Sequence, residues 1–248
     1  METFSYSKPR IIITGAGGGI GRACALLFAK KGYRLALFVH KNDRLLKEEM
    51  ETAGFLGHQD YRLFHLDISD PEQVKAATEA ALSFLGGIDL LVNNAGIAHF
   101  ALDQDVSPSE WQMLIGTNLS GLTYVTRNVI PAMIAKPGGK IINISSMWGT
   151  YGASCEAAYS ATKGGINAYT KALAKELAPM HIPVNAIAFG VVDTEMNARL
   201  TNEERAVLEE QIPFGRMAST DEAAQMISLL AEAPEYLTGQ IIGFDGAF

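Results

Sequence analysis

Residues 11–31 read IIITGAGGGIGRACALLFAKK and combine three features in a fixed order. A short continuous apolar run, typical of a strand buried on both faces of a sheet, comes first. Glycines then dominate residues 15–21, and residues 20–31 predict a helix. Glycines allow a tight turn that brings a pyrophosphate against the amides of a helix N-terminus, where the helix dipole favours negative charge. The predicted diphosphate contacts are Gly15, Gly17, Gly18, Gly19, Ile20 and Gly21.

The same alternation of strand and helix patterns continues along the chain. Strands are predicted at residues 11–14, 35–39, 61–66, 88–93, 140–145, 184–188 and 240–244. Such alternation predicts an α/β fold, a doubly wound parallel sheet of about seven strands with helices on both faces. No linker-like stretch interrupts it, so residues 1–248 are predicted to form a single domain. Ligands of such sheets bind at the carboxyl ends of the strands, where Thr14, Asn93 and Ser145 fall.

Composition narrows the classes of function. The net charge of −7, with no local block of lysines or arginines, opposes binding to nucleic acid or to acidic membranes. No apolar run suits a signal peptide or a membrane span, which predicts a cytoplasmic protein. The five histidines are scattered and the two cysteines, Cys24 and Cys155, form neither a disulfide framework nor a metal spacing. We therefore expect no metal site, and we expect both cysteines to be small, partly buried residues.

Residues 145–163, SSMWGTYGASCEAAYSATK, carry the candidate chemistry. Tyr159 and Lys163 are four residues apart, so they lie on the same face of a helix, where the lysine ammonium would favour the ionised phenol. Ser146, just after an apolar strand, could fix a carbonyl or alcohol oxygen while Tyr159 exchanges a proton with it. Alone, this spacing is a weak pattern that favours an ordinary amphipathic helix with a surface tyrosine and lysine over a carbonyl-reducing site.

The end of the second predicted strand bears on the choice of cofactor. A site for NAD usually places a carboxylate there, about 20 residues beyond the glycines, to accept the ribose hydroxyls. Here the chain reads FVHKN, and the first acid is Asp43. His40 and Lys41 could instead face a 2′-phosphate, so the sequence predicts NADP(H) over NAD(H); as solvated loop residues they would have no such role.

Together with TGAGGGIG at residues 14–21, the motifs NNAG at 93–96, Asn118, Ser146 and YSATK at 159–163 resemble those of the short-chain dehydrogenase/reductase family, over nearly the whole chain. That resemblance implies a Rossmann-type domain with Tyr159 as acid/base, Lys163 as its activator and nicotinamide-ribose ligand, and Ser146 as substrate-oxygen ligand. It implies that Asn118 holds a water linking Lys163 to solvent. The further cofactor contacts that it implies are Asp67, Ile68, Asn94, Ala95, Gly96, Gly190, Val192 and Thr194.

One departure from the family pattern stands out. The usual NxxxPG motif reads NAIAFG at residues 185–190, so Phe189 replaces the proline and its ring could alter or cover the nicotinamide position. Residues 191–214, with weaker periodicity and many acids, predict a helical flap that closes over substrate.

Within the family, the segments TNLSG, GKIINISSMWG, PFGRMAS and YLTGQIIGFDG resemble bacterial 3-oxoacyl-[acyl-carrier-protein] reductases. The resemblance implies reduction of a 3-oxoacyl thioester, small or carrier-bound, and assembly as a homotetramer. Lys171 and Lys175 could meet an acidic carrier protein, although Pro131 stands where such reductases commonly carry an arginine. A sugar, polyol or small-ketone dehydrogenase of the same family, and a nucleotide-binding protein without turnover, are the alternatives.

Overall fold

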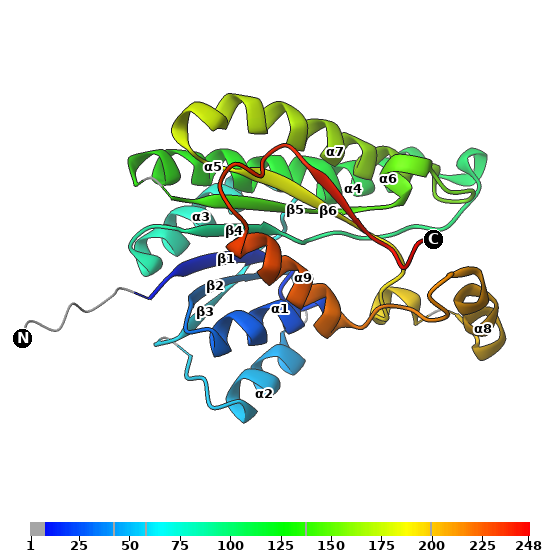
Figure 1. The fold of residues 1–248 in the computed structure, drawn as a ribbon, viewed down its shortest axis with the longest axis horizontal. Coiled ribbons are helices and arrows are strands. Elements are labelled where there is room, and N and C mark those ends of the chain that lie inside the picture. The colour runs from blue at the N-terminus through cyan, green and yellow to red at the C-terminus, as the bar shows by residue number, and fades with distance from the viewer. Residues whose placement is uncertain (1–7, 42, 58, 137, 199) are drawn as a thin grey trace, which may run out of the picture.

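A seven-stranded, wholly parallel sheet forms the centre of the molecule, with strand order β3-β2-β1-β4-β5-β6-β7 (Figure 1). The structure is a computed structural model that describes residues 8–41, 43–57, 59–136, 138–198 and 200–248. The strands are β1 (Arg10–Thr14), β2 (Arg34–Val39), β3 (Tyr61–His65), β4 (Leu90–Asn93), β5 (Lys140–Ser146), β6 (Val184–Phe189) and β7 (Ile241–Phe244). The chain builds the sheet outward from β1 to β3 on one side and then continues from β4 on the other side of β1. A ligand cleft is expected at the carboxyl ends of β1 and β4, where the strand order changes sides. The predicted fold class is confirmed.

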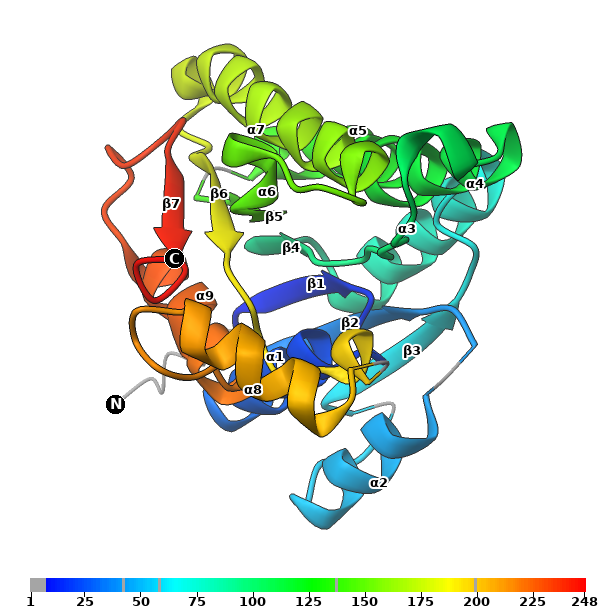
Figure 2. The ribbon, with the colours of Figure 1, turned by 90° about the vertical axis from the view of Figure 1, so that its right-hand side faces the viewer.

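Helices cover both faces of the sheet (Figure 1). On one face lie α1 (Gly19–Lys30), α2 (Arg44–Thr52) and α9 (Thr220–Glu232). On the other lie α3 (Pro71–Leu85), α4 (Pro108–Leu114), α5 (Gly121–Ala135) and α7 (Ala157–Leu177). The short helix α6 (Trp148–Tyr151) and α8 (Asn202–Gln211) lie beyond the carboxyl ends of the strands (Figure 2). Both faces of the sheet are thus protected from water, as parallel sheets require.

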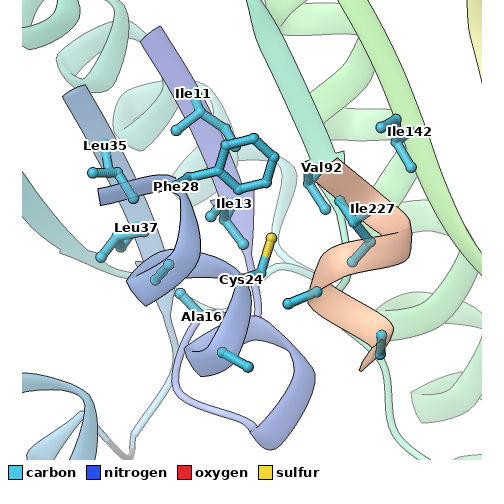
Figure 3. Close-up of a cluster of buried hydrophobic side chains, with 14 of the residues drawn as sticks. Ile11, Ile13, Ala16, Cys24, Phe28, Leu35, Leu37, Val92, Ile142 and Ile227 are labelled. Carbon is cyan, nitrogen blue, oxygen red and sulfur yellow. The ribbon is translucent and has the colours of Figure 1, made fainter. Parts of the chain in front are cut away.

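Alternation along β1 divides the core into two clusters. Ile11 and Ile13 point to the face covered by α1, where they pack with Phe28 and Cys24 (Figure 3), whereas Ile12 joins the cluster on the opposite face. Successive side chains of a strand point to opposite faces, so a strand covered on both sides must be apolar at every position. This explains the continuous isoleucine run, and it confirms that Cys24 is a buried core residue.

Local capping signals define where several helices begin. Asp70 accepts hydrogen bonds from the backbone of the first turn of α3, and Pro71 follows at the first helical position. Ser107 and Ser219 form reciprocal capping boxes at α4 and α9 with the glutamates three residues later.

The helix that leads from α4 into α5 is continuous but irregular. Residues Ile115–Ser120 form a turn of π-helix between the two, and Asn118 lies within it. Turns of this kind insert one extra residue into a helix and often occur at functional sites. Among the described residues, no helix is both long enough and apolar enough to cross a bilayer.

Candidate active site

The glycine-rich turn is packed too tightly for side chains. Gly15 has a positive φ of 64°, and a Cβ there would lie 2.7 Å from Cα of Ala95. A Cβ on Gly21 would lie 2.2 Å from the carbonyl oxygen of Gly15. The hydroxyl of Thr14 accepts hydrogen bonds from the backbone N–H groups of Asn94 and Ala95, both at 3.0 Å. Two of the predicted motifs, the glycine turn and the turn after β4, therefore form one unit.

We expect Gly21→Ala to be strongly destabilising. Its new methyl group would overlap a backbone oxygen, so the turn or α1 must shift, at a cost of about 1–3 kcal/mol or more. Gly18→Ala is the matched control, because a Cβ there meets only the Gly15 oxygen, at an ordinary 3.7 Å. Urea denaturation of both variants measures the difference. Equal midpoints would contradict the close packing of this turn.

Hydrogen bonds along one face of α7 fix this helix on β5. The Lys163 ammonium donates to the carbonyl oxygen of Ile144 at 2.9 Å. One turn later, Asn167 accepts a hydrogen bond from the Ser145 hydroxyl at 2.6 Å, and a turn further Thr170 accepts one from Asn143 at 2.9 Å. The three positions, 163, 167 and 170, follow the helical repeat. These three hydrogen bonds determine the position of Tyr159 relative to Ser146.

Ser146 is buried at the last position of β5. Its hydroxyl oxygen accepts a hydrogen bond from the backbone N–H of Trp148 at 3.2 Å, because α6 turns back over the strand end. A hydroxyl that accepts one hydrogen bond keeps its proton available for another acceptor. Ser146 also lies close enough to the phenol of Tyr159 to lower the pKa of that phenol. The predicted pair is therefore brought together.

Burial dominates the ionisation of the other two predicted catalytic residues. Burial raises the pKa of Tyr159 to about 12, and the charge of Glu156 adds to it while Ser146 opposes it. Burial lowers the pKa of Lys163 to about 8. The ammonium does lie near the phenol ring, 5.5 Å from its centroid, but it is directed at the Ile144 carbonyl. Loss of hydration is thus the largest influence on both pKa values, and the role of Lys163 in favouring the ionised phenol stays a prediction.

Asn118 is fully buried, and its side-chain amide is engaged by protein groups. Its oxygen accepts the N–H of Ile97 at 2.8 Å, while its nitrogen donates to the Ile97 carbonyl at 2.9 Å and to Thr162 at 3.2 Å. A Cβ on Gly96 would lie 3.4 Å from the Asn118 oxygen and 3.6 Å from the Lys163 nitrogen. The side chain of Asn118 therefore ties the chain after β4 to α7 beside Lys163.

At the other end of the cleft, His40 and Lys41 are exposed just beyond β2. Asp67 lies near His40, whose charge contributes to lowering the pKa of this carboxyl, although hydrogen bonds from Ser69 contribute more. Asp43 begins α2, and its carboxylate contacts Lys47 at 2.7 Å and His65 at 2.8 Å. The one acid near the end of β2 in the sequence is thus already paired with basic side chains.

The segment after β6 approaches the glycine turn. Thr194 packs against Gly19, where a Cβ would lie 3.0 Å from the threonine methyl. Val192 is buried and forms an isolated β-bridge with Ala218, and a Cβ on Gly190 would lie 2.7 Å from Cα of Asp245. Residues 190–194 are therefore held between the sheet and α1, close to the turn that was predicted to bind the diphosphate.

Phe189 does not cover the cleft. It extends β6 by one residue beyond the predicted end, is 3% exposed, and packs edge-on against Phe244 with ring centroids 5.7 Å apart. The expectation of a ring over the nicotinamide position is wrong, because the pleat of β6 directs this side chain into the core. An aromatic pair with β7 fills the space instead.

Sequence reasoning missed Asn167, Arg22 and Glu195. Asn167 lies one turn beyond Lys163 on the same face of α7, which is a signal that the sequence did contain. Arg22 and Glu195 form an ion pair across 173 positions, at 2.9 Å, and nothing in the sequence pattern links them.

Comparisons with known proteins agree with this geometry. The family model "short chain dehydrogenase" matches residues 9–205. A 3-oxoacyl-[acyl-carrier-protein] reductase of Thermotoga maritima is 39% identical over 236 residues, 95% of each chain, and an uncharacterized oxidoreductase of Bacillus subtilis is 37% identical over 238 residues, 96% of this chain and 97% of that one. A variant of actinorhodin polyketide ketoreductase, solved with NADPH, superposes with a TM-score of 0.89 at 30% identity and 96% coverage of both chains. The chain belongs to the short-chain dehydrogenase/reductase family, whose members are oxidoreductases that use a nicotinamide cofactor.

Proposed function

We propose that this protein reduces a carbonyl group to a secondary alcohol with NADPH, and that its substrate is a 3-oxoacyl thioester. The observation that carries the proposal is the convergence of Ser146, Tyr159 and Lys163 at the end of β5, on the same edge of the sheet as the glycine turn. This reaction requires a proton donor, a hydroxyl that hydrogen-bonds to the carbonyl oxygen of the substrate, and a cleft for the dinucleotide.

The residues present fit a dinucleotide. The first turn of α1, all of whose residues the structure describes, contains no acidic side chain, and no side chain of the turn caps it. Its N–H groups and the absence of Cβ atoms at residues 15, 19 and 21 suit a diphosphate. Gly96 and Thr194 would line the rest of the cofactor site, and Lys163 would bind the nicotinamide ribose.

In the proposed reaction, the protein handles the substrate oxygen. When bound, the nicotinamide supplies the hydride to the carbonyl carbon. Ser146, which accepts the Trp148 N–H, donates its own proton as a hydrogen bond to the carbonyl oxygen. Tyr159, protonated at neutral pH because burial raises its pKa to about 12, gives its proton to the same oxygen as negative charge develops there. The buried Lys163 ammonium stabilises the phenolate that is left.

The preference for NADPH is proposed from the charges beyond β2. His40 and Lys41 are exposed there, and the nearest acid in sequence, Asp43, is paired with Lys47 and His65. A 2′-phosphate would therefore meet positive charge, whereas the ribose hydroxyls of NADH would find no free carboxylate at this strand end.

The substrate class is proposed from the apolar side chains near the catalytic residues. Phe100 and Leu102, in the chain after β4, and Tyr151, in α6, are each more than half exposed. The backbone N–H of Ala101 donates to the carbonyl of Cys155 at 2.9 Å, which joins that chain to the turn before α7. An apolar rim favours an acyl chain over a sugar or polyol, and the name of the Thermotoga maritima relative points the same way.

Turnover with acetoacetyl thioester tests this proposal. We expect oxidation of NADPH to be at least about tenfold more efficient than that of NADH, since charge-assisted hydrogen bonds contribute about 1.5–3 kcal/mol. A His40→Ala, Lys41→Ala double variant should lose most of this preference while keeping turnover with NADH. Activity on a small ketone or a sugar, with none on the thioester, would show that the substrate is a different one. The proposed mechanism would be unchanged. Equal efficiency with both cofactors would refute the assignment of His40 and Lys41.

The same assay, run with two forms of the thioester, tests the proposed carrier partner. Lys171 and Lys175 are exposed on α7 and would contact an acidic carrier, so the carrier-bound thioester should have a lower KM than the coenzyme A thioester.

We further propose a homotetramer. Trp111 and Met113 in α4 and Ile134 in α5 expose apolar surface that such an interface would cover. Light scattering of the purified protein gives the mass.

A further inference from the structure

The carboxylate of Glu195 lies at the N-terminus of α1. One of its oxygens is 3.1 Å from where a Cβ on Gly19 would stand, and the backbone N–H of Gly19 contributes to lowering the pKa of this carboxyl. The amides of the first turn have no partner within the helix, and α1 has no side-chain cap of its own. A carboxylate from a distant part of the chain therefore lies beside the donors that the glycine turn leaves open.

Arg22 holds the same carboxylate from the side. Its guanidinium contacts Glu195 at 2.9 Å and Glu49 at 3.1 Å, and it donates to the carbonyl of Gly17 at 3.3 Å. Burial alone would raise the pKa of Glu195, but backbone N–H groups and Arg22 outweigh it, so the net pKa is lowered. Negative charge is thus favoured at this position, as it is for a phosphate at a helix N-terminus.

Glu195 also lies within the flap predicted at residues 191–214. It begins a short 3-10 helix (Glu195–Asn197), in which the Asn197 side chain donates to the Val192 carbonyl at 2.8 Å. Asp193 forms two hydrogen bonds with Arg205 of α8, at 2.9 and 2.7 Å. The Glu195 side chain itself is 58% exposed, so it can leave α1 without opening the core. A movement of Glu195 would therefore also shift α8.

We propose that Glu195 occupies, through its carboxylate, the position of the cofactor diphosphate on α1, and that cofactor binding displaces it and shifts the 3-10 helix Glu195–Asn197 and α8. This inference rests on the proposed use of a dinucleotide. Two anions cannot share the space beside Gly19 and the adjacent Arg22, so binding of the diphosphate requires Glu195 to move. Cofactor binding would thereby change the position of the segment that borders the substrate.

Binding affinities test the competition without turnover. By isothermal titration calorimetry, Glu195→Gln should bind NADPH and ADP about fivefold more tightly than the unchanged protein, in line with the usual strength of a charge at a helix N-terminus. Adenosine, which has no phosphate, should bind both equally. Glu210→Gln, a change of the same type at an exposed position of α8, should leave all three affinities unchanged.

Hydrogen exchange of residues 195–211 tests the displacement itself. ADP should speed amide exchange there in the unchanged protein, whereas the Glu195→Gln variant should exchange rapidly with or without ADP. Equal affinities of the two proteins for ADP and NADPH, weaker binding by the variant, or exchange that ADP does not alter would each overturn the inference while the proposed function stands. Failure of the unchanged protein to bind NADPH or NADH would overturn the proposed function and this inference together.

Discussion

Tyr159→Phe should lower turnover by a factor on the order of 100 or more while the Kd for NADPH stays nearly constant. The substitution removes one oxygen atom and keeps the ring, so the packing of α7 on β5 is preserved. Loss of a positioned proton donor typically costs 10²–10⁴-fold in rate. Lys163 keeps its hydrogen bond to the Ile144 carbonyl, since that contact does not involve the phenol.

The matched control for this prediction is Tyr236→Phe. Tyr236 lies between α9 and β7, is fully exposed, and is given no role in substrate binding or proton transfer. Rates are measured with acetoacetyl thioester at saturating NADPH, and Kd by fluorescence titration of NADPH. A Tyr159→Phe variant that keeps more than about a tenth of the rate would rule out Tyr159 as the proton donor.

Most of the sheet could be predicted because its strands are buried on both faces. The run Ile11, Ile12 and Ile13 has no polar member, and such a run between glycine and helix signals permits few other interpretations. The predicted strand ends fall within two residues of the observed ones. The π-helical turn around Asn118 was not predicted, because apolar periodicity over a single turn does not distinguish it from an α-helix.

The residues of the candidate site were predicted from the sequence, but their pKa values were not. Helical spacing alone places Tyr159 and Lys163 on one face, and the structure agrees. Their pKa values depend on how deeply α7 packs on β5, which is a property of the whole fold. Phe189 was misjudged for a similar reason: a family motif with proline suggested a loop, whereas pairing of β6 with β7 makes it a strand residue. The contact of Glu195 with Arg22 depends on tertiary structure alone.

Reductive turnover should fall as the pH rises through about 8. The pKa of Lys163 is lowered to about 8 by burial, so its ammonium form is complete well below that pH and is lost above it. Only the ammonium stabilises the phenolate that Tyr159 becomes when it gives up its proton. Tyr159 itself, with a pKa of about 12, remains protonated throughout the range, so it does not cause the decline. The profile of kcat between pH 6 and 10 at saturating NADPH measures this.

Lys163→Met should reduce kcat at pH 7 by two orders of magnitude or more and abolish the decline above pH 8. Unlike Tyr159→Phe, it should also weaken NADPH binding, because the proposed ribose ligand is lost. Lys163→Arg should fail to restore activity despite its charge, since the Lys163 side chain is buried beside Gly96 and a guanidinium is larger and planar. The Met variant should unfold at the same temperature or higher, because it removes a buried charge whose protonated form burial disfavours. A kcat that stays flat through pH 8, or that decreases as the pH is lowered, would show that the charge of Lys163 is not what supports proton transfer.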